Sequence, residues 1–430
     1  MPASVILGGH WGDEGKGKLI DLVAAQCSHN VRYSGGANAG HTVVNDRGSF
    51  ALHQVPSGVF HEKTVAMLAG GVVVDPPALL DEIQKLRARG VALDRFYISE
   101  RAHLVLPYHR LLDAEREQRR GARALGTTGK GMGPAYADKA SRDGLRIGDM
   151  LDPDAFAVKV QQSVELANQQ LQRLYDATPL PVEQTVSEAR AWAEALRPHI
   201  CDVERELRDV LRRGRRVLLE GAQGALLDID AGSYPFVTSA STGVAGACGS
   251  AGIPVAQVDS IVVVLHAYMT RVGAGPFPAE LKGEAGQYLR TVGKEFGTTT
   301  GRARRCGWFD AVASRYSIDV NGATSLALTK LDVLDSLGHI RICAAYELDG
   351  KRIDYLPSRA EQLERVTPIY EDLPGWKTST EDARSWDDLP LAAQGYVRRV
   401  EELMETPVSV VSVGPARHQT LVLRDPLEVA

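Results

Sequence analysis

Short runs of mostly apolar, β-branched residues recur along the chain and are typical of strands that are covered on both faces. They lie at residues 5–7, 217–219, 261–265, 326–329 and 408–413. The apolar spacing of a helix occupies residues 77–89, just before Gly90, and the longer tracts 154–175 and 182–213. We therefore expect an α/β fold whose large, mostly parallel central β-sheet is flanked by helices, with the motifs gathered at the carboxyl ends of the strands.

Length, charge and cysteines narrow the class of protein. No low-complexity run or linker divides the 430 residues, so one large elaborated domain is as reasonable as two. A net charge of −5 argues against a general binder of nucleic acid or of anionic membranes. The five cysteines lack C-x-x-C spacing, and the sequence shows neither a secretory leader nor an apolar stretch long enough to span a membrane. We expect a cytoplasmic protein with free thiols.

The first apolar run leads directly into a loop that suits phosphate chemistry. The sequence VILGGHWGDEGKGKLID spans residues 5–21. We expect the glycines at 8, 9, 12, 15 and 17 to allow turns with positive φ and to bring backbone N–H groups close to an anion at the start of a helix, where Lys16 and Lys18 add positive charge. A Gly-rich loop with a purely structural role is the alternative.

Residues 12–18 of this loop fit the P-loop pattern G-x-x-x-x-G-K, with one departure. Leu19 stands where a P-loop has the Ser or Thr that binds Mg²⁺, so the metal ligand must come from elsewhere. Asp13 is the candidate, because an acid inside a phosphate cradle needs a bridging cation or a role in proton transfer.

A second glycine-rich segment, YSGGANAGHTVV at residues 33–44, carries polar side chains of the kind that contact ligands. His41 is its one side chain that titrates near neutral pH. A lone histidine is more often structural, but a general acid is needed beside the loop that holds Asp13, and this favours a catalytic role for His41.

Two later segments also suggest ligand contacts. TKLD places Lys330 and Asp332 just beyond an apolar run. A carboxylate there can accept hydrogen bonds from the N1–H and the 2-amino group of guanine, two donors that the adenine base of ATP lacks. A charge pair at a strand end is the alternative. Residues 297–305 combine threonines with Arg302 and Arg304, which suits a dicarboxylate or a phosphate, and the flanking glycines are typical of a lid. An exposed solvated loop is the alternative there. The small residues of segment 239–252 permit close approach of either a ligand or a partner subunit.

These motifs, taken in order, resemble the adenylosuccinate synthetase family. The resemblance covers nearly the whole chain and rests on WGDEGKGK, NAGHT, GTTGKGMGPAY (126–136), EGAQGALLDID (220–230), YPFVTS (234–239), TRVGAGPFP (270–278), GTTTGRARR (297–305), TKLDVLD (329–335) and SVGPAR (412–417). It implies a single domain over residues 1–430, with helical and loop insertions. It also implies a GTP-dependent ligase of purine nucleotide biosynthesis that joins L-aspartate to IMP through 6-phosphoryl-IMP.

The resemblance also implies roles for individual residues. Asp13 resembles the general base that takes the N1 proton of IMP, and His41 the general acid, while Lys16 stabilises the transferring phosphoryl group. Mg²⁺ is expected on Asp13 and the Gly40 carbonyl. The implied protein is a homodimer in which Arg142 reaches into the site of the partner subunit.

The implied binding residues form three groups. IMP is expected to contact Asp13, Lys16, Asn38, Thr128, Gln223, Thr238, Arg302 and the partner subunit's Arg142. GTP is expected to contact Gly12, Asp13, Glu14, Gly15, Lys16, Gly17, Lys18, Gly40, His41, Thr42, Arg304, Lys330, Leu331, Asp332, Ser412, Val413 and Gly414. Aspartate is expected to contact Thr298, Thr299, Thr300, Gly301, Arg302 and Arg304.

Two other functions remain open from the sequence. A regulatory GTP-binding switch is supported by the phosphate loop and TKLD but opposed by Leu19 and by the additional ligand-type loops. A related synthetase that uses a guanine nucleotide as acceptor is opposed by Asp13, because the resemblance implies that such a relative lacks the equivalent aspartate.

Overall fold

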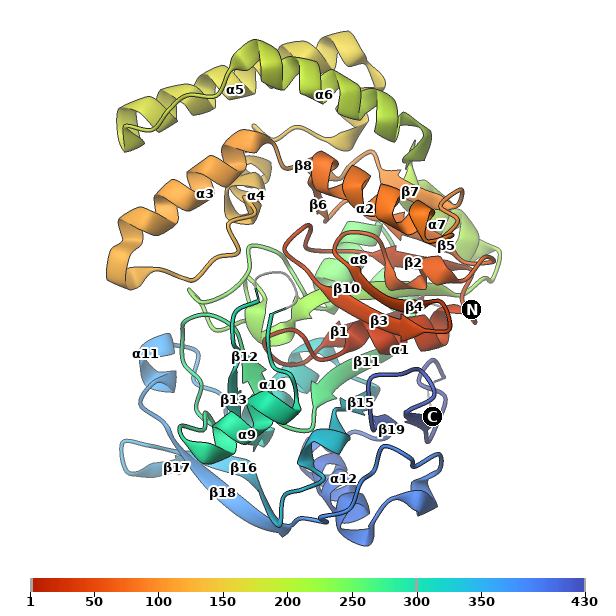
Figure 1. The fold of residues 1–430 in the computed structure, drawn as a ribbon, viewed down its shortest axis with the longest axis vertical. Helices are drawn as coiled ribbons and strands as arrows, with labels where there is room; N and C mark the ends of the chain where they lie inside the picture. The colour runs from red at the N-terminus through yellow and green to blue at the C-terminus, as the bar shows by residue number, and fades with distance from the viewer. Residues whose placement is uncertain (1–2, 298–300, 429–430) are drawn as a thin grey trace.

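The computed structural model describes residues 3–297 and 301–428, and its centre is one ten-stranded sheet (Figure 1). The strand order is β20-β19-β15-β11-β1-β10-β2-β5-β7-β9. All neighbours pair in parallel except β19 and β20. The bounds are β1 Ala3–Gly8, β2 His29–Arg32, β5 Val65–Leu68, β7 Phe96–Ser99, β9 Ile200–Cys201, β10 Val217–Gly224, β11 Val258–His266, β15 Ser325–Thr329, β19 Val408–Ser412 and β20 Thr420–Val422.

All five apolar runs are confirmed as strands of this sheet, and they supply its central part. The side chains of β1 alternate: Val5 and Leu7 pack into the main hydrophobic core on one face, whereas Ile6 packs with Leu19 and Ile20 of α1 (Lys16–Ala24) on the other. Both faces are therefore covered, and this is why these strands are apolar at consecutive positions rather than at alternate ones.

Helices flank the sheet and extend beyond one end of it (Figure 1). A second hydrophobic core lies between the sheet edge and α2, α3, α5 and α6, and α5 packs on α6. The bounds are α1 Lys16–Ala24, α2 Pro76–Ala88, α3 Pro107–Arg120, α4 Met132–Ser141, α5 Pro153–Tyr175, α6 Val182–Leu196, α7 Val203–Arg212, α8 Val244–Ala251, α9 Glu284–Val292, α10 Ala311–Asn321, α11 Ala360–Leu363 and α12 Leu391–Met404.

The helices expected at residues 77–89 and 154–175 are confirmed as α2 and α5, but the tract 182–213 is not one helix. It is divided into α6, a 3-10 turn, the short strand β9 and α7. Pro198 lacks the N–H that would continue the helical hydrogen bonds, and Asp202 caps α7 by accepting a hydrogen bond from the backbone N–H of Arg205 at 3.1 Å. The intervening residues pair with β7 at the sheet edge.

Smaller elements complete the fold. β16, β17 and β18 form a separate sheet with β14 at the end of the molecule opposite α5 and α6 (Figure 1). The remaining bounds are β3 His41–Asn45, β4 Gly48–Leu52, β6 Val73–Val74, β8 His103–Leu104, β12 Met269–Arg271, β13 Arg305–Gly307, β14 Phe309–Asp310, β16 His339–Leu348, β17 Lys351–Ile353 and β18 Thr367–Pro374. Within residues 3–297 and 301–428, no helix has the length and apolar character needed to cross a membrane.

The parallel pairing brings the sequence motifs to one edge of the sheet. The carboxyl ends of β1, β10, β11, β15 and β19 lie side by side in the order given above, and the phosphate loop, Gln223, Lys330 and the segment from Ser412 follow or end these strands. Ligands of open parallel sheets bind at this edge. The expected position of the motifs is therefore confirmed.

Candidate active site

A cavity of about 420 Å³ opens at the carboxyl edge of the sheet. It brings together residues that are separated by up to several hundred positions in the sequence. The residues expected at the site that line it are Gly12, Asp13, Lys16, Asn38, Gly40, His41, Thr128, Gln223, Thr238 and Arg302. The whole expected IMP set is thus present around one cavity, apart from Arg142.

The phosphate loop follows β1 and ends where α1 begins at Lys16. Gly12, Asp13 and Gly15 have φ values of 88°, 64° and 83°, in the left-handed region. The expectation of positive φ was wrong for the other three glycines. Gly8 makes room for the Glu14 carboxylate, Gly9 packs on the side chains of β11, and Gly17 on His41.

Glu14 is fully buried and braces the loop from inside. Its Oε1 accepts hydrogen bonds from the backbone N–H groups of His10 at 3.0 Å and Gly12 at 2.8 Å, and its Oε2 lies 2.5 Å from Lys16 Nζ. The carboxylate thus holds the loop closed and fixes the amine of Lys16 beside the cavity. We infer that the side chain of Glu14 stabilises the loop and that contact with an anion is left to its backbone.

Asp13 stands at the wall of the cavity, and its side chain is 29% exposed. Its Oδ2 lies 2.8 Å from Nη2 of Arg304, whose Nη1 lies 2.5 Å from Glu295 Oε2. Glu295 also pairs with Lys330 at 2.5 Å. Burial raises the pKa of Glu295, but the charges of Lys330 and Arg304 outweigh it and lower that pKa overall. This chain of alternating charges links the phosphate loop to the TKLD segment.

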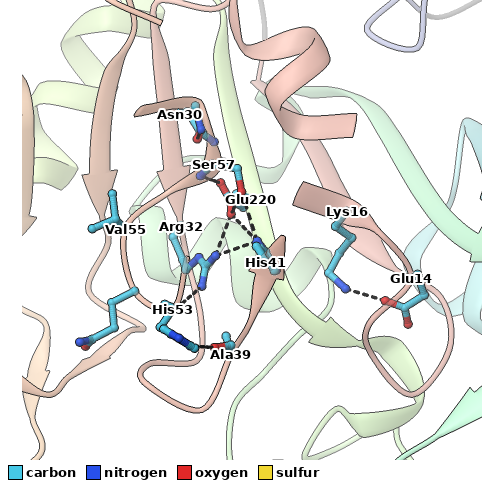
Figure 2. A network of polar contacts seen from close by, with 12 residues as sticks. Glu14, Lys16, Asn30, Arg32, Ala39, His41, His53, Val55, Ser57 and Glu220 are labelled. Atoms are coloured by element: carbon cyan, nitrogen blue, oxygen red, sulfur yellow. Dashed lines mark hydrogen bonds and ion pairs between the residues drawn. The ribbon is translucent and has the colours of Figure 1, made fainter. Parts of the chain in front are cut away.

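His41, at the start of β3, is held by a network of buried polar side chains (Figure 2). Its Nδ1 lies 2.7 Å from Oε1 of Glu220 and 2.7 Å from Nη2 of Arg32. Burial and the charges of Arg32 and Lys16 lower the pKa of His41 to about 4, against the opposing effect of Glu220. The imidazole is therefore neutral at pH 7 in the protein without ligands.

In the described part of the chain, amide atoms of two side chains in the cavity wall lack hydrogen-bond partners. Neither the Nε2 nor the Oε1 of Gln223 has a partner among the residues that the structure describes, and the same holds for Oδ1 of Asn38. Both amides are buried at these atoms and line the cavity. Because buried polar atoms are nearly always hydrogen-bonded, these atoms indicate where a polar ligand is expected.

The TKLD segment shows the same feature. Oδ1 of Asp332 is buried without a partner in the described part of the chain, and burial raises the pKa of Asp332 to about 6. Lys330 Nζ is engaged by the Gly293 carbonyl at 2.9 Å and by Glu295, and Leu331 lies in the hydrophobic core. Within the described residues, Asp332 is thus the residue of TKLD whose carboxylate has an oxygen available to accept hydrogen bonds from a nucleobase.

The last expected GTP contacts are tied to the phosphate loop by Lys18. Its Nζ donates to Oγ of Ser412 at 2.8 Å and to the carbonyl of Gly414 at 2.7 Å. Val413 is fully buried between them. The loop after β19 and the loop after β1 are thereby held together, outside the lining of the 420 Å³ cavity.

Some expected residues are not brought to the cavity. Arg142 is exposed at the carboxyl end of α4, Thr42 is exposed on β3, and Gly301 is exposed. Gly17 is buried against His41. Thr298, Thr299 and Thr300 lie outside the described residues.

Several residues of the cavity wall were not expected from the sequence. Arg116 and Arg120 of α3 line it, although the many charges of that helix suggest a solvated face. Arg271 is fully buried, 4.8 Å from the ring centroid of Trp11, and burial lowers its pKa to about 9. No sequence signal marks α3, whereas Arg271 belongs to the segment TRVGAGPFP.

A family model described as adenylosuccinate synthetase matches residues 5–421. Relatives named adenylosuccinate synthetase include a Synechocystis protein, 48% identical over 98% of this chain and 95% of its own length, and one from Thermosynechococcus vestitus, 49% identical over 99% and 96%. The structure of fully ligated adenylosuccinate synthetase from Plasmodium falciparum has a TM-score of 0.93 and 36% identity, and the match covers 98% of this chain and 100% of that one.

The chain belongs to the adenylosuccinate synthetase family. It is an enzyme of the class that forms a carbon–nitrogen bond. The resemblance of the motifs and the mostly parallel α/β fold are both confirmed. The cyanophage S-2L succinoaminodeoxyadenylate synthetase, bound to dGMP and dATP, is 19% identical with a TM-score of 0.61 over 99% of this chain and 97% of its own, and this shows a likeness of fold.

Proposed function

We propose that the cavity joins L-aspartate to IMP by way of 6-phosphoryl-IMP, with GTP as the phosphoryl donor and adenylosuccinate, GDP and phosphate as the products. One observation carries the assignment to this cavity: the unpartnered amide of Gln223 stands in the same wall as Asp13, Lys16 and His41. A purine base with donors and acceptors on its edge is the kind of ligand that satisfies such an amide.

The first step is phosphoryl transfer. Asp13 takes the N1 proton of IMP, and the 6-oxygen that becomes negative attacks the γ-phosphorus of GTP, whose bond to the β,γ-bridging oxygen breaks to release GDP. Lys16 and the backbone N–H groups of the loop oppose the charge on the transferring group, and His41 donates a hydrogen from Nε2. Arg304 fixes the position of the Asp13 carboxylate before substrates enter.

The second step forms the carbon–nitrogen bond. The amino group of aspartate attacks C6, the C6–O bond breaks, and phosphate leaves with the oxygen atom of IMP. The proton lost by the amine is released, and N1 of the purine is left without a proton. Arg302 lines the cavity and offers a planar guanidinium that suits the carboxylates of aspartate.

Mg²⁺ fits the donors of this cavity. No cluster of three or more His, Cys, Asp or Glu side chains occurs in residues 3–297 and 301–428, but Mg²⁺ is commonly held by one or two carboxylates together with substrate phosphates. The Asp13 carboxylate and the Gly40 carbonyl, both in the cavity wall, would hold it. When bound, the ion supplies positive charge to the phosphate oxygens.

We further propose guanine recognition by Asp332, next to Lys330, with the loop of Ser412 and Gly414 closing over the base. The carboxylate oxygen of Asp332 that has no partner among the described residues and the hydrogen bonds from Lys18 to Ser412 and Gly414 support this assignment.

We also propose a cytoplasmic homodimer in which Arg142 contributes to the site of the partner subunit. The exposure of Arg142 supports the dimer, and the free state of all five cysteines supports a reducing compartment.

Replacing Asp13 by asparagine tests the proposed function. Asp13→Asn preserves the shape of the side chain but removes the base, so kcat should fall by about 10² or more. Asp13→Asn also removes the proposed Mg²⁺ ligand, so the affinity for GTP, measured by calorimetry in the presence of Mg²⁺, should fall as well. Turnover near the wild-type rate would refute the role of Asp13.

The choice of acceptor separates this function from its alternatives. With GTP and aspartate supplied, IMP should be consumed and dGMP should not. Preference for dGMP would favour the guanine-nucleotide synthetase. GTP cleavage in a single turnover that does not require IMP would instead favour a regulatory switch.

A further inference from the structure

The carboxylate of Glu220 is the centre of the network behind His41 (Figure 2). Glu220 lies on β10, opposite Arg32 of β2 in the register of the two strands, and both side chains are 0% exposed. Oε1 of Glu220 lies 2.8 Å from Arg32 Nη2 and 2.9 Å from Ser57 Oγ, and Oε2 accepts from the Ser57 backbone N–H at 2.8 Å. The carboxylate is thus fixed from three sides.

His41 contacts this network through one ring nitrogen only. Nδ1 faces both Glu220 and Arg32 at 2.7 Å, so Nε2 lies on the opposite edge of the ring. His41 packs closely against α1, since a Cβ added at Gly17 would lie only 3.0 Å from the Cβ of His41. The ring is therefore positioned by the network and by the first turn of the helix together.

The two partners of Nδ1 select different proton states. A bare Nδ1 accepts a hydrogen bond from the Arg32 guanidinium, whereas a protonated Nδ1 donates to Glu220. Nδ1 therefore has a partner in either tautomer, and Glu220 fixes the ring both directly and through Arg32.

We propose that Glu220 is a positioning residue for His41: its carboxylate, held by Arg32 and Ser57, fixes the Nδ1 edge of the ring and thereby orients Nε2 towards the cavity. The inference rests on the proposed role of His41.

The test is a double-mutant cycle with His41. Glu220→Gln retains an oxygen acceptor but removes the charge, so kcat should fall about 10²-fold, while the KM values for IMP, GTP and aspartate change by no more than about threefold. On the His41→Asn background, Glu220→Gln should cost no further activity, because Glu220 acts through His41. An equal loss on both backgrounds would overturn the proposal.

Glu204→Gln is the matched control. Glu204 is also buried, and it too accepts from a serine hydroxyl, a backbone N–H and an arginine: Ser99 at 2.7 Å, Gly70 at 3.0 Å and Arg101 at 2.8 Å. It does not line the cavity, so its replacement should lower the Tm without changing kcat. If His41→Asn itself leaves kcat unchanged, the role of His41 fails; if only Glu220→Gln is inert, this inference alone fails.

Discussion

At the scale of the residue, the proposed recognition of guanine depends on one carboxylate oxygen of Asp332. Its Oδ1 is buried and has no partner among the described residues. Guanine offers two donors on the edge that would meet this carboxylate, and xanthine offers one donor and one acceptor. A change from carboxylate to amide therefore replaces an acceptor by a donor at the position that distinguishes the two bases.

We expect Asp332→Asn to lower kcat/KM for GTP about ten- to hundredfold, the scale of a lost charged hydrogen bond, and to improve use of XTP. Steady-state kinetics with both nucleotides measures the change in preference. Asp335→Asn is the control, because Asp335 is already engaged by Trp376 and Thr380, at 2.8 Å and 2.9 Å. Unchanged preference in Asp332→Asn would mean that TKLD is a structural turn.

At the scale of the residue, the sequence predicted the chemistry of the site better than it predicted the backbone conformation. Asp13, Lys16 and His41 were found from the chemistry that a phosphate loop requires, and the structure brings them to one cavity. Two supporting glutamates were not found: Glu220, the partner of His41, and Glu295, the partner of Arg304, which in turn holds Asp13. Each lies far away in sequence, and a buried glutamate has no local signature. Gly8, Gly9 and Gly17 were misjudged because close packing and positive φ both select glycine.

At the scale of the element, α1 joins two requirements in its first turn. Lys16 must face the cavity, and Gly17 must leave room for His41 of β3. The helix as an isolated element would be more stable with alanine than with glycine at this position. The glycine is therefore explained by packing against the site and not by the needs of the helix.

We predict that Gly17→Ala lowers kcat about tenfold, because the new Cβ would lie 3.0 Å from the His41 Cβ and 3.4 Å from Ser57 Oγ and must displace the ring. Gly249→Ala is the matched control, since Gly249 lies within α8 and its Cβ would have nothing within 4 Å. That variant should keep wild-type kcat and gain stability by about 0.4–1 kcal/mol. Unaltered kcat in Gly17→Ala, with thermal melts confirming the fold, would show that His41 tolerates displacement.

Strands were predicted better than helix ends. A short run of consecutive apolar residues suits a strand that is covered on both faces, and all five such runs are strands of the central sheet. The tract 182–213 was joined incorrectly because its apolar spacing is helical on both sides of the break. The break depends on Pro198, the cap at Asp202 and pairing with β7, and the last of these is a tertiary contact that periodicity does not report.

At the scale of the whole molecule, the site depends on strands from both ends of the chain. β1 begins at Ala3 and β20 ends at Val422, and both belong to one sheet. This supports the expectation of a single domain over residues 1–430. The strand order was beyond sequence reasoning, because parallel neighbours such as β1 and β10 pair over more than two hundred residues. The edge at which the motifs meet was predictable, because it follows from parallel pairing alone.

In the proposed homodimer, we expect Arg142 to act in the site of the partner subunit. Arg142 lies at the end of α4 with φ of 73°, exposed and outside the cavity of its own chain. An arginine is always charged and binds phosphate in a fixed geometry, so a partner subunit's Arg142 can complete the IMP site. We predict that Arg142→Leu raises the KM for IMP strongly and leaves GTP binding nearly intact, because a remote phosphate contact acts on substrate binding more than on chemistry.

Mixing subunits tests whether the site is shared. Asp13→Asn chains combined with Arg142→Leu chains should form hybrid dimers with one intact site, built from the Asp13 of one chain and the Arg142 of the other, and activity should rise above that of either parent. The control mixes Asp13→Asn with Gln223→Met, whose lesions lie in the wall of the same cavity. Each hybrid site then carries one lesion, and no activity should be regained. If hybrids form, as mass spectrometry can establish, and both mixtures stay inactive, each subunit has a complete site and Arg142 does not act across the interface.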